Sequence, residues 1–314
     1  MVCCQWLFVS IARQNRILVL NKRSFLLIAS PDKHTGRRTI APPRTGTFAG
    51  KVALITGSES GIGRETAREL ARQGACVMLN GLRPDLLTDT LRTFTDAGYT
   101  ANACVADVTD YAACQRLVNE TITAFGRLDM LVANASISMR AYFNDLDVDV
   151  FRAVCDSNIY GTVYPLKAAL PHLLTAGGCV TFVSSVSSLN GMPSGSAYCA
   201  GKAAVSNLAH TLRLEWHGTG LHVGVIHLGF TTNDPEKRVF AADGQPVLLA
   251  HRPPRLQMSQ RAVAQNIAKH IERRRNTTIL TGMGKLNAFM NRFFPAIADW
   301  LVLLTMKRWP ALYE

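Results

Sequence analysis

The 314-residue sequence lacks the features that mark several protein classes. Its eight cysteines include no Cys-x-x-Cys pair and no His/Cys cluster at metal-ligand spacing, so no metal site is expected. No uncharged apolar run approaches the ~20 residues that a membrane-spanning helix needs. With 48% hydrophobic residues, the chain is long enough to bury a large core. Neither a fold stabilised by a bound metal ion nor an integral membrane protein is therefore expected.

The cysteines also bear on location, because the chain has no clear secretory signal. The cysteines at positions 3, 4, 76, 104, 114, 155, 179 and 199 are interpreted as reduced and mostly buried. This predicts an intracellular protein, cytoplasmic or associated with an organelle or a membrane.

Acidic residues are nearly absent from the first part of the chain. Residues 1–50 carry eight Lys and Arg against one Asp, so +7 of the net charge of +12 lies there. Residues 51–285 carry only +4 and no basic face interleaved with aromatic residues, so no nucleic-acid partner is expected. Residues 1–49 are predicted to be a basic extension: an organellar transit peptide, a disordered segment, or residues upstream of the real start.

From Lys51 onward, short apolar runs alternate with segments of helical periodicity. The runs are "KVALIT", "ACVMLN", "TANACVAD", "LDMLVAN", "GCVTFVSS", "LHVGVIHLG" and "TTILTG". Buried strands that alternate with helices indicate βαβ units and a parallel sheet with helices on both faces. We therefore expect an α/β fold, a Rossmann-type doubly wound sheet of about seven strands, in a single domain over residues 50–285.

Two segments depart from this alternation. Residues 233–258 contain four Pro and one Gly and follow the sixth strand, where loops of an α/β sheet hold ligands. They are the candidate substrate lid, and the alternative is an ordinary surface loop. Residues 286–314 form an apolar tail, and its most apolar part, 286–306, is interrupted by Arg, Pro and Asp. The tail is predicted to lie in a membrane interface, cover an apolar substrate entrance, or pack on its own domain or in a dimer.

A glycine-rich turn, "TGSESGIG" from Thr56 to Gly63, follows the first strand and opens the first helix. Glycines permit a tight turn there, and the free N–H groups of the helix N-terminus attract a pyrophosphate. No Lys follows, so the turn is not a P-loop. The second strand ends without an acid but is followed by Arg83, which favours a 2′-phosphate and hence NADP. Asp107 and Asn134 end two further strands and border the same crevice.

A second group of polar residues lies in the following segments. Tyr198 precedes Lys202 by about one helical turn, so their polar heads share a helix face. Ser185 ends the fifth strand, and Asn158 lies within a long helical segment, where Asn is a poor helix former. Cys199 points about 100° away from Tyr198 on a helix and is interpreted as a packing residue.

Together, the glycine motif, Asp107, "NAS", "SNIYG", Ser185 and "YCAGK" resemble the short-chain dehydrogenase/reductase family over residues 50 to 285. The resemblance implies an Asn158–Ser185–Tyr198–Lys202 tetrad. Tyr198 would be the general acid/base, with a pKa lowered from ~10 by Lys202 and the oxidised nicotinamide. Ser185 would bind the substrate oxygen, Lys202 would also hold the nicotinamide ribose, and Asn158 would hold a water linking Lys202 to solvent.

The resemblance also implies a set of cofactor-binding residues. These are Thr56, Gly57, Ser58, Ser60, Gly61, Ile62, Gly63, Arg83, Asp107, Val108, Asn134, Ala135, Tyr198, Lys202, Gly229 and Thr231. Two positions depart from the family pattern: Ser136 replaces the glycine of Asn-Ala-Gly, and Leu228 replaces the proline of Pro-Gly.

The expected function is hydride transfer between NADP, or NAD, and a carbonyl/secondary alcohol pair. The apolar lid and tail favour a steroid-, retinoid- or lipid-like substrate. The alternative is a non-catalytic NADP(H)-binding sensor or scaffold on the same fold. A homo-oligomer, dimer or tetramer, is also expected, with peripheral membrane contact through residues 286–306 as a further hypothesis.

Overall fold

The computed structural model describes residues 46–249 and 257–309. The predicted extension 1–49 therefore lies outside the described residues, apart from 46–49, and so does the 250–256 part of the predicted lid.

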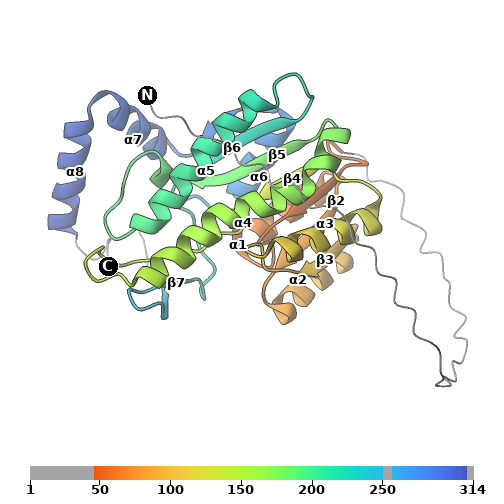
Figure 1. Cartoon of the computed structure of the whole chain (residues 1–314), viewed down its shortest axis with the longest axis horizontal. Coiled ribbons are helices and arrows are strands. Elements are labelled where there is room, and N and C mark those ends of the chain that lie inside the picture. The colour runs from red at the N-terminus through yellow and green to blue at the C-terminus, as the bar shows by residue number, and fades with distance from the viewer. Residues whose placement is uncertain (1–45, 250–256, 310–314) are drawn as a thin grey trace, which may run out of the picture. The chain divides into compact units, whose positions relative to one another are not determined.

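Seven parallel strands form the central sheet in the order β3-β2-β1-β4-β5-β6-β9 (Figure 1). The strands are β1 Val52–Ile55, β2 Cys76–Gly81, β3 Ala101–Val105, β4 Met130–Ala133, β5 Cys179–Ser185, β6 His222–Leu228 and β9 Thr277–Ile279. Every pair of neighbours runs parallel. The predicted doubly wound α/β fold is thus confirmed, and each of the seven apolar runs contains one strand.

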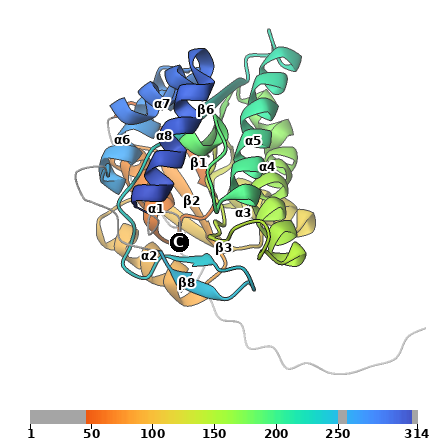
Figure 2. The same cartoon turned by 90° about the vertical axis from the view of Figure 1, so that its left-hand side faces the viewer.

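Helices cover both faces of the sheet, as Figure 2 shows. One layer contains α1 Gly61–Arg72, α2 Pro84–Asp96 and α6 Gln260–Glu272. The other contains α3 Tyr111–Phe125, α4 Val148–Thr175 and α5 Ser196–Glu215. Each layer buries its own apolar cluster against the sheet, so the strands are covered on both sides.

The order of the strands positions the functional cleft. The chain builds β1, β2 and β3 outward in one direction, and then crosses to place β4 on the other side of β1. In open α/β sheets, ligands bind outside the carboxyl ends of the strands at this reversal. The turns that follow β1 and β4 therefore meet at the expected binding position.

The predicted lid contains more regular structure than its Pro and Gly content indicates. A two-stranded antiparallel hairpin forms from β7 Arg238–Phe240 and β8 Pro246–Leu248. The hairpin is fixed to the loop after β4, because Phe240 bridges to Met139 and its carbonyl oxygen accepts the Arg140 N–H at 2.8 Å. The lid is thus anchored beside the cleft.

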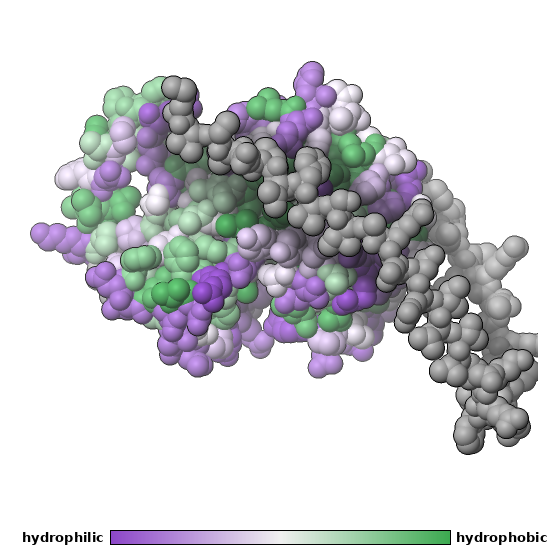
Figure 3. Space-filling view, in the orientation of Figure 1, coloured by the Kyte–Doolittle hydropathy of each residue, from purple (hydrophilic) through white to green (hydrophobic). Residues whose placement is uncertain are grey.

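The predicted apolar tail forms two helices, α7 Gly282–Phe293 and α8 Pro295–Arg308, which are separated by Phe294. α7 packs against the short 3₁₀ helix η1 (Val186–Ser188), and Asn287 donates a 2.6 Å hydrogen bond to Asn190. Among the helices of the described residues, none combines the length and hydropathy that crossing a bilayer requires. Hydrophobic side chains gather on the surface of α7 and α8, at the left of Figure 3.

Candidate active site

A cleft of about 1360 Å³ opens at the carboxyl ends of the strands. This exceeds the roughly 300–1,000 Å³ typical of a single small-molecule pocket, so it has room for a cofactor together with a substrate. Most of the predicted cofactor residues line it. They are Gly57, Ser60, Gly61, Ile62, Gly63, Arg83, Asp107, Val108, Asn134, Ala135, Gly229 and Thr231, and Tyr198, Lys202 and Ser185 of the predicted tetrad line the same cleft.

The glycine turn forms a cradle that side chains would block. Gly57 has a φ of +59°, and a Cβ there would come within 2.9 Å of the Cα of Ala135. A Cβ on Gly63 would overlap the carbonyl oxygen of Gly57. Gly61 also has a positive φ, of +58°, but faces open space. Because the cradle opens at the N-terminus of α1, it fits the pyrophosphate of a nicotinamide dinucleotide.

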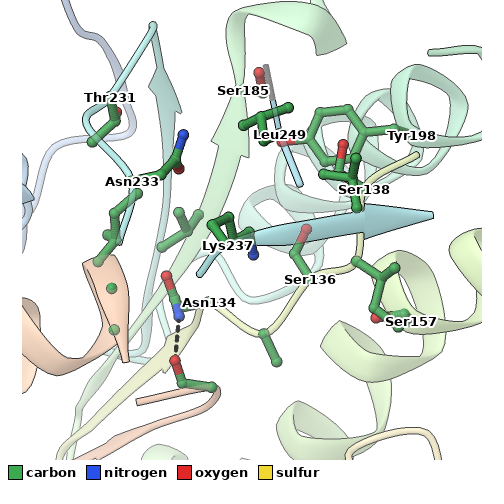
Figure 4. Close-up of a pocket in the computed structure, with 18 of the residues that line it drawn as sticks. Asn134, Ser136, Ser138, Ser157, Ser185, Tyr198, Thr231, Asn233, Lys237 and Leu249 are labelled. Atoms are coloured by element: carbon green, nitrogen blue, oxygen red, sulfur yellow. Dashed lines mark hydrogen bonds between the residues drawn. The ribbon is translucent and has the colours of Figure 1, made fainter. Parts of the chain in front are cut away.

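Two predicted cofactor residues lie behind this cradle. Thr56 and Ser58 are fully buried and do not line the cleft. The Thr56 hydroxyl accepts the backbone N–H groups of Asn134 and Ala135 at 3.0 Å each. The Asn134 amide donates to the carbonyl oxygens of Thr56 and Gly57 at 2.9 and 3.0 Å. Figure 4 draws one of these bonds as a dashed line. These bonds join the turns after β1 and β4.

An acidic side chain of the lid lies at the N-terminus of α1. The Asp234 carboxylate accepts the Gly61 N–H at 3.0 Å. The same carboxylate pairs with Arg64 at 3.4 Å and accepts the Gln260 amide at 3.0 Å. Asp234 thus supplies negative charge at a position where helix geometry favours an anion.

The end of β2 carries a carboxylate that comes from the glycine turn. Glu59 lies against Gly81, where a Cβ would overlap the Glu59 carboxylate. Glu59 accepts the Arg83 side chain at 2.8 Å and its backbone N–H at 2.9 Å. Asn80 is buried and donates to the β3 end, at the carbonyl oxygen of Ala106. A carboxylate therefore lies at the end of β2 although the strand itself supplies none, and Arg83 is ion-paired with it.

Lys237 extends from the lid toward the middle of the cleft (Figure 4). Burial lowers the pKa of Lys237, and the positive charge of Arg83 lowers it further, while Asp234 and Glu59 act in the opposite direction. Lys237 thus adds an amino group to the cleft, whose charged form Asp234 and Glu59 favour and burial and Arg83 disfavour.

Tyr198 and Lys202 lie one turn apart on α5, as the sequence predicts. The Lys202 ammonium lies 5.7 Å from the centroid of the Tyr198 ring and donates to the Val183 carbonyl oxygen at 3.0 Å. Lys202 is 3% exposed, and this burial, followed by the charge of Lys237, lowers its pKa to about 7. The Tyr198 ring reaches into the cleft close to Ser185 and Ser138 (Figure 4).

Ser185 is held in a tight turn at the end of β5. Its hydroxyl accepts the Ser187 N–H at 3.2 Å. The imidazole of His227 contacts the Ser188 hydroxyl at 2.9 Å and the Ser185 carbonyl oxygen at 3.3 Å. Burial lowers the pKa of His227, which keeps the ring neutral. The neighbouring strand thus fixes the turn that presents Ser185.

Asn158 is fully buried in α4 and does not line the cleft. Its amide donates to the carbonyl oxygens of Ile137 and Val154 at 2.8 Å each. Its side-chain oxygen accepts the Ser136 hydroxyl at 2.9 Å. Ser136, which stands where the family pattern has glycine, thus uses its hydroxyl to bind Asn158. Asn158 fixes the turn after β4, and the water link to Lys202 stays a prediction.

Cys199 lines the cleft beside Tyr198, but its thiol is buried, and burial raises its pKa. A thiol of raised pKa is a poor nucleophile, which agrees with the predicted packing role.

Sequence reasoning missed several charged residues of the cleft, among them Glu59, Arg140, Asp234 and Lys237. Glu59 lies within the glycine motif, but its carboxylate turns toward β2. Asp234 contacts Gly61 across 173 positions of sequence. No local spacing signals such a contact; the only available hint was the density of charge in "NDPEKR" of the lid.

The known proteins to which this chain is similar in sequence are named as dehydrogenases. A family profile described as short chain dehydrogenase matches residues 51–243. Over 202 residues the chain is 36% identical to 11-beta-hydroxysteroid dehydrogenase 1A of Arabidopsis thaliana, a match that covers 63% of this chain and 58% of that protein. Over 208 residues it is 35% identical to cis-4-hydroxycyclohexanecarboxylate dehydrogenase of Sinomonas cyclohexanicum, covering 66% and 83%. The chain thus spans less than two thirds of the plant relative.

The fold is similar to the crystal structure of a short chain dehydrogenase/reductase from Burkholderia phymatum in complex with NAD. The TM-score is 0.70 at 22% identity, and the match covers 80% of this chain and 96% of that chain. This likeness supports the architecture of the sheet and its helices.

Proposed function

Because the chain belongs to the short-chain dehydrogenase/reductase family, we propose that it is an NAD(P)-dependent oxidoreductase that interconverts a secondary alcohol and a carbonyl compound. The observation that carries this proposal is that Ser185, Tyr198 and Lys202 line one cleft together with a glycine cradle. A protein that only binds a dinucleotide needs the cradle, but it does not need an acid/base pair.

Each of these side chains has a distinct role in the proposed reaction. When bound, the nicotinamide accepts or supplies the hydride at the reacting carbon. Ser185 donates a hydrogen bond to the substrate oxygen and so stabilises its developing charge. In the oxidation direction, the Tyr198 phenolate takes the proton from the substrate hydroxyl as the carbon loses the hydride; reduction is the reverse.

Lys202 acts through electrostatics. Its ammonium, 5.7 Å from the ring centroid, stabilises the anionic form of the Tyr198 side chain. The bond to the Val183 carbonyl oxygen holds the ammonium in place. We also propose that Lys202 contacts the nicotinamide ribose, and that a water held near Asn158 returns protons to Lys202.

The test is turnover of a panel of ketones and secondary alcohols, followed by nicotinamide absorbance. We expect Tyr198→Phe to lower kcat by about 10²–10⁴-fold, since this is the usual contribution of a positioned acid/base group. The phenyl ring keeps the packing but loses the hydroxyl that is expected to contact the cofactor, so cofactor affinity should fall by at most about 10-fold, far less than kcat. Unchanged turnover in the variant contradicts the proposal. Cofactor binding without turnover of any substrate supports the sensor or scaffold alternative instead.

We further propose that NADP is favoured over NAD, with Arg83 as the 2′-phosphate contact and Lys237 as a second cation near it. Glu59 limits this preference, because it accepts the Nε–H of Arg83, partly neutralises its charge and would accept a ribose hydroxyl. Measured dissociation constants for both cofactors test this. We expect Glu59→Gln to raise the preference for NADP about 10-fold and Arg83→Met to lower it. Opposite shifts contradict the assignment.

For the substrate, we propose an apolar steroid-, retinoid- or lipid-like molecule. Part of the cleft wall carries apolar side chains from η1, the loop before α5 and the lid. These are Val186, Met192, Pro193, Val239 and Leu249. A larger kcat/KM for cyclic or long-chain ketones than for small polar ketones supports this class.

We also propose that α7 and α8 contact an anionic lipid surface. Trp300 and Leu303 are 60% and 63% exposed, and residues 282–309 carry Lys285 and three further cations against one acid. Sedimentation with vesicles of phosphatidylglycerol, and of phosphatidylcholine alone, tests this. We expect binding to the anionic vesicles that Leu303→Ser weakens and Leu214→Ser, on α5, does not. A dimer by light scattering without vesicle binding would instead favour the expected homo-oligomer as the occupant of this face.

A further inference from the structure

Arg140 lies at the substrate side of the cleft and is fixed by its backbone. Its N–H donates to the Phe240 carbonyl oxygen of the lid at 2.8 Å, and the N–H of Ala141 donates to the Ser194 carbonyl oxygen at 3.1 Å. The Arg140 side chain lines the cleft together with Tyr198. The segment thus joins the lid to the loop before α5, and its position does not depend on the guanidinium.

The Arg140 guanidinium forms no ion pair within the described part of the chain. One of its N–H groups donates to the Met139 carbonyl oxygen at 3.0 Å. By contrast, Arg64 pairs with Asp234 and Arg83 with Glu59. The lid residues outside the described part, 250–256, contain no Asp or Glu. Burial lowers the pKa of Arg140, while the neighbouring Tyr198 and Cys199 act in the opposite direction. A largely buried cation of this kind calls for a counter-ion.

Ser194, beside Arg140, provides a second and independent observation. It is 6% exposed, lines the cleft, and its hydroxyl has no hydrogen-bond partner among the described residues. Its φ is +59°, an unusual backbone conformation for a residue with a Cβ. The loop holds this conformation immediately before α5, whose N-cap is Gly195. A Cβ on Gly195 would lie 3.8 Å from the Arg140 guanidinium, so this group lies close to the positive end of the helix.

We infer that Arg140, assisted by Ser194, binds a carboxylate of the substrate, so that the preferred substrates are hydroxy acids and oxo acids with an apolar body. This inference rests on the proposed oxidoreductase function. One guanidinium matches the single charge and the two oxygens of a carboxylate, and the Ser194 hydroxyl supplies a further donor. The apolar wall of the cleft takes the remainder of the molecule.

The test compares one oxo acid with its methyl ester, 4-oxocyclohexanecarboxylate and methyl 4-oxocyclohexanecarboxylate. The ester removes the charge and keeps the ketone. We expect the wild-type kcat/KM to be about 10- to 100-fold higher for the acid, the size of a charge-assisted pair. Arg140→Met should remove this preference, mainly through a higher KM for the acid. Arg140→Lys should keep part of it, and Ser194→Ala should reduce it by a smaller factor.

Arg152→Met is the matched control, because Arg152 is exposed on α4 and pairs with Asp149 outside the cleft. It should leave the kinetics of both substrates unchanged. Equal kcat/KM for acid and ester in the wild type overturns the inference but leaves the proposed oxidoreductase intact. A loss of kcat for both substrates in Arg140→Met, with a displaced pH profile, also overturns it, because Arg140 then acts on Tyr198.

Ligand-induced changes in Tm, which need no turnover, distinguish failure of the oxidoreductase proposal from failure of the carboxylate proposal. In the presence of NADP, the acid should raise the Tm of Tyr198→Phe more than the ester does, and Arg140→Met should abolish the difference. If no substrate is turned over but the acid still binds through Arg140, the oxidoreductase proposal fails alone. If the acid has no effect on Tm and turnover of other ketones is normal, the carboxylate proposal fails alone.

Discussion

The contact between Asp234 and the N-terminus of α1 leads to a specific prediction about cofactor affinity. The Asp234 carboxylate accepts the Gly61 N–H at 3.0 Å, at the helix end where the pyrophosphate of the cofactor is expected. The carboxylate and the pyrophosphate therefore compete for the same donors and repel each other. Asp234→Asn keeps the shape and one acceptor oxygen but removes the charge. We expect this variant to bind NADP and NAD more tightly.

The magnitude follows from charge separation and exposure. Two unit charges about 5 Å apart interact by roughly 3 kcal/mol at an effective dielectric constant near 20. The Asp234 side chain is 32% exposed and pairs with Arg64 at 3.4 Å, so solvent and the guanidinium screen part of this repulsion. About 1–2 kcal/mol should remain, which corresponds to roughly 5- to 30-fold in the dissociation constant.

The assay is a fluorescence titration of reduced cofactor at low and at high salt. The gain should shrink at high salt, because the effect is electrostatic. Asp243→Asn is the control: Asp243 is an exposed acid of the same lid that accepts the Gln245 N–H at 2.9 Å, and its replacement should leave the affinity unchanged. Unchanged or weaker binding in Asp234→Asn would refute the reasoning, because Asp234 would then hold the lid in its binding conformation.

Three further predictions concern stability and the cradle. Lys202→Met should raise the Tm near pH 7 while lowering kcat more than about 100-fold, because it removes a buried cation that the proposed reaction needs. The wild-type pKa of Lys202 is lowered to about 7, so between about pH 7 and pH 10.5 only the unfolded chain keeps this proton. The unfolding free energy of the wild type should therefore rise with pH in this window. If Lys202→Met shows the same slope of unfolding free energy against pH, this assignment is contradicted. Gly63→Ala should lower the unfolding free energy, measured by urea denaturation, by about 2–4 kcal/mol, since the new Cβ would overlap the Gly57 carbonyl oxygen. Gly61→Ala should lower it by about 1 kcal/mol, because only the φ of +58° is unfavourable there. Equal losses in the two variants would argue against the cradle geometry. Ser136→Ala should lower the unfolding free energy by about 1 kcal/mol, because Asn158 loses a buried hydrogen-bond donor, and an unchanged value would show that the bond contributes nothing.

Much of the fold could be predicted from local patterns in the sequence. A strand or a helix depends on residues within one or two turns, so apolar runs and helical periodicity were enough to place all seven strands of the main sheet. The same holds for the glycine turn, whose positive φ values follow from residue type, and for Tyr198 and Lys202, which share a face because they are one turn apart. The small hairpin of the lid was missed, because its strands are only three residues each and one begins with Pro.

The residues that surround the predicted tetrad were decided by the tertiary structure. Asn158 was expected to hold a water that links Lys202 to solvent; its side chain holds the turn after β4, and the water link stays a prediction. Arg83 was expected to contact a 2′-phosphate, which stays a prediction; the structure adds that Glu59 reaches Arg83 across the end of β2.

The sequence by itself therefore determined the type of fold, the cradle and the chemical groups at its centre, because each depends on neighbours along the chain. Only the tertiary structure decided the charge around that centre: Asp234 at Gly61, Lys237 in the cleft, and Arg140 near Ser194 with no acidic partner among the residues that the structure describes. These positions depend on where the lid and the loop before α5 return to the sheet. The path of the chain between distant segments is set by packing of the whole domain, which no short stretch of sequence encodes.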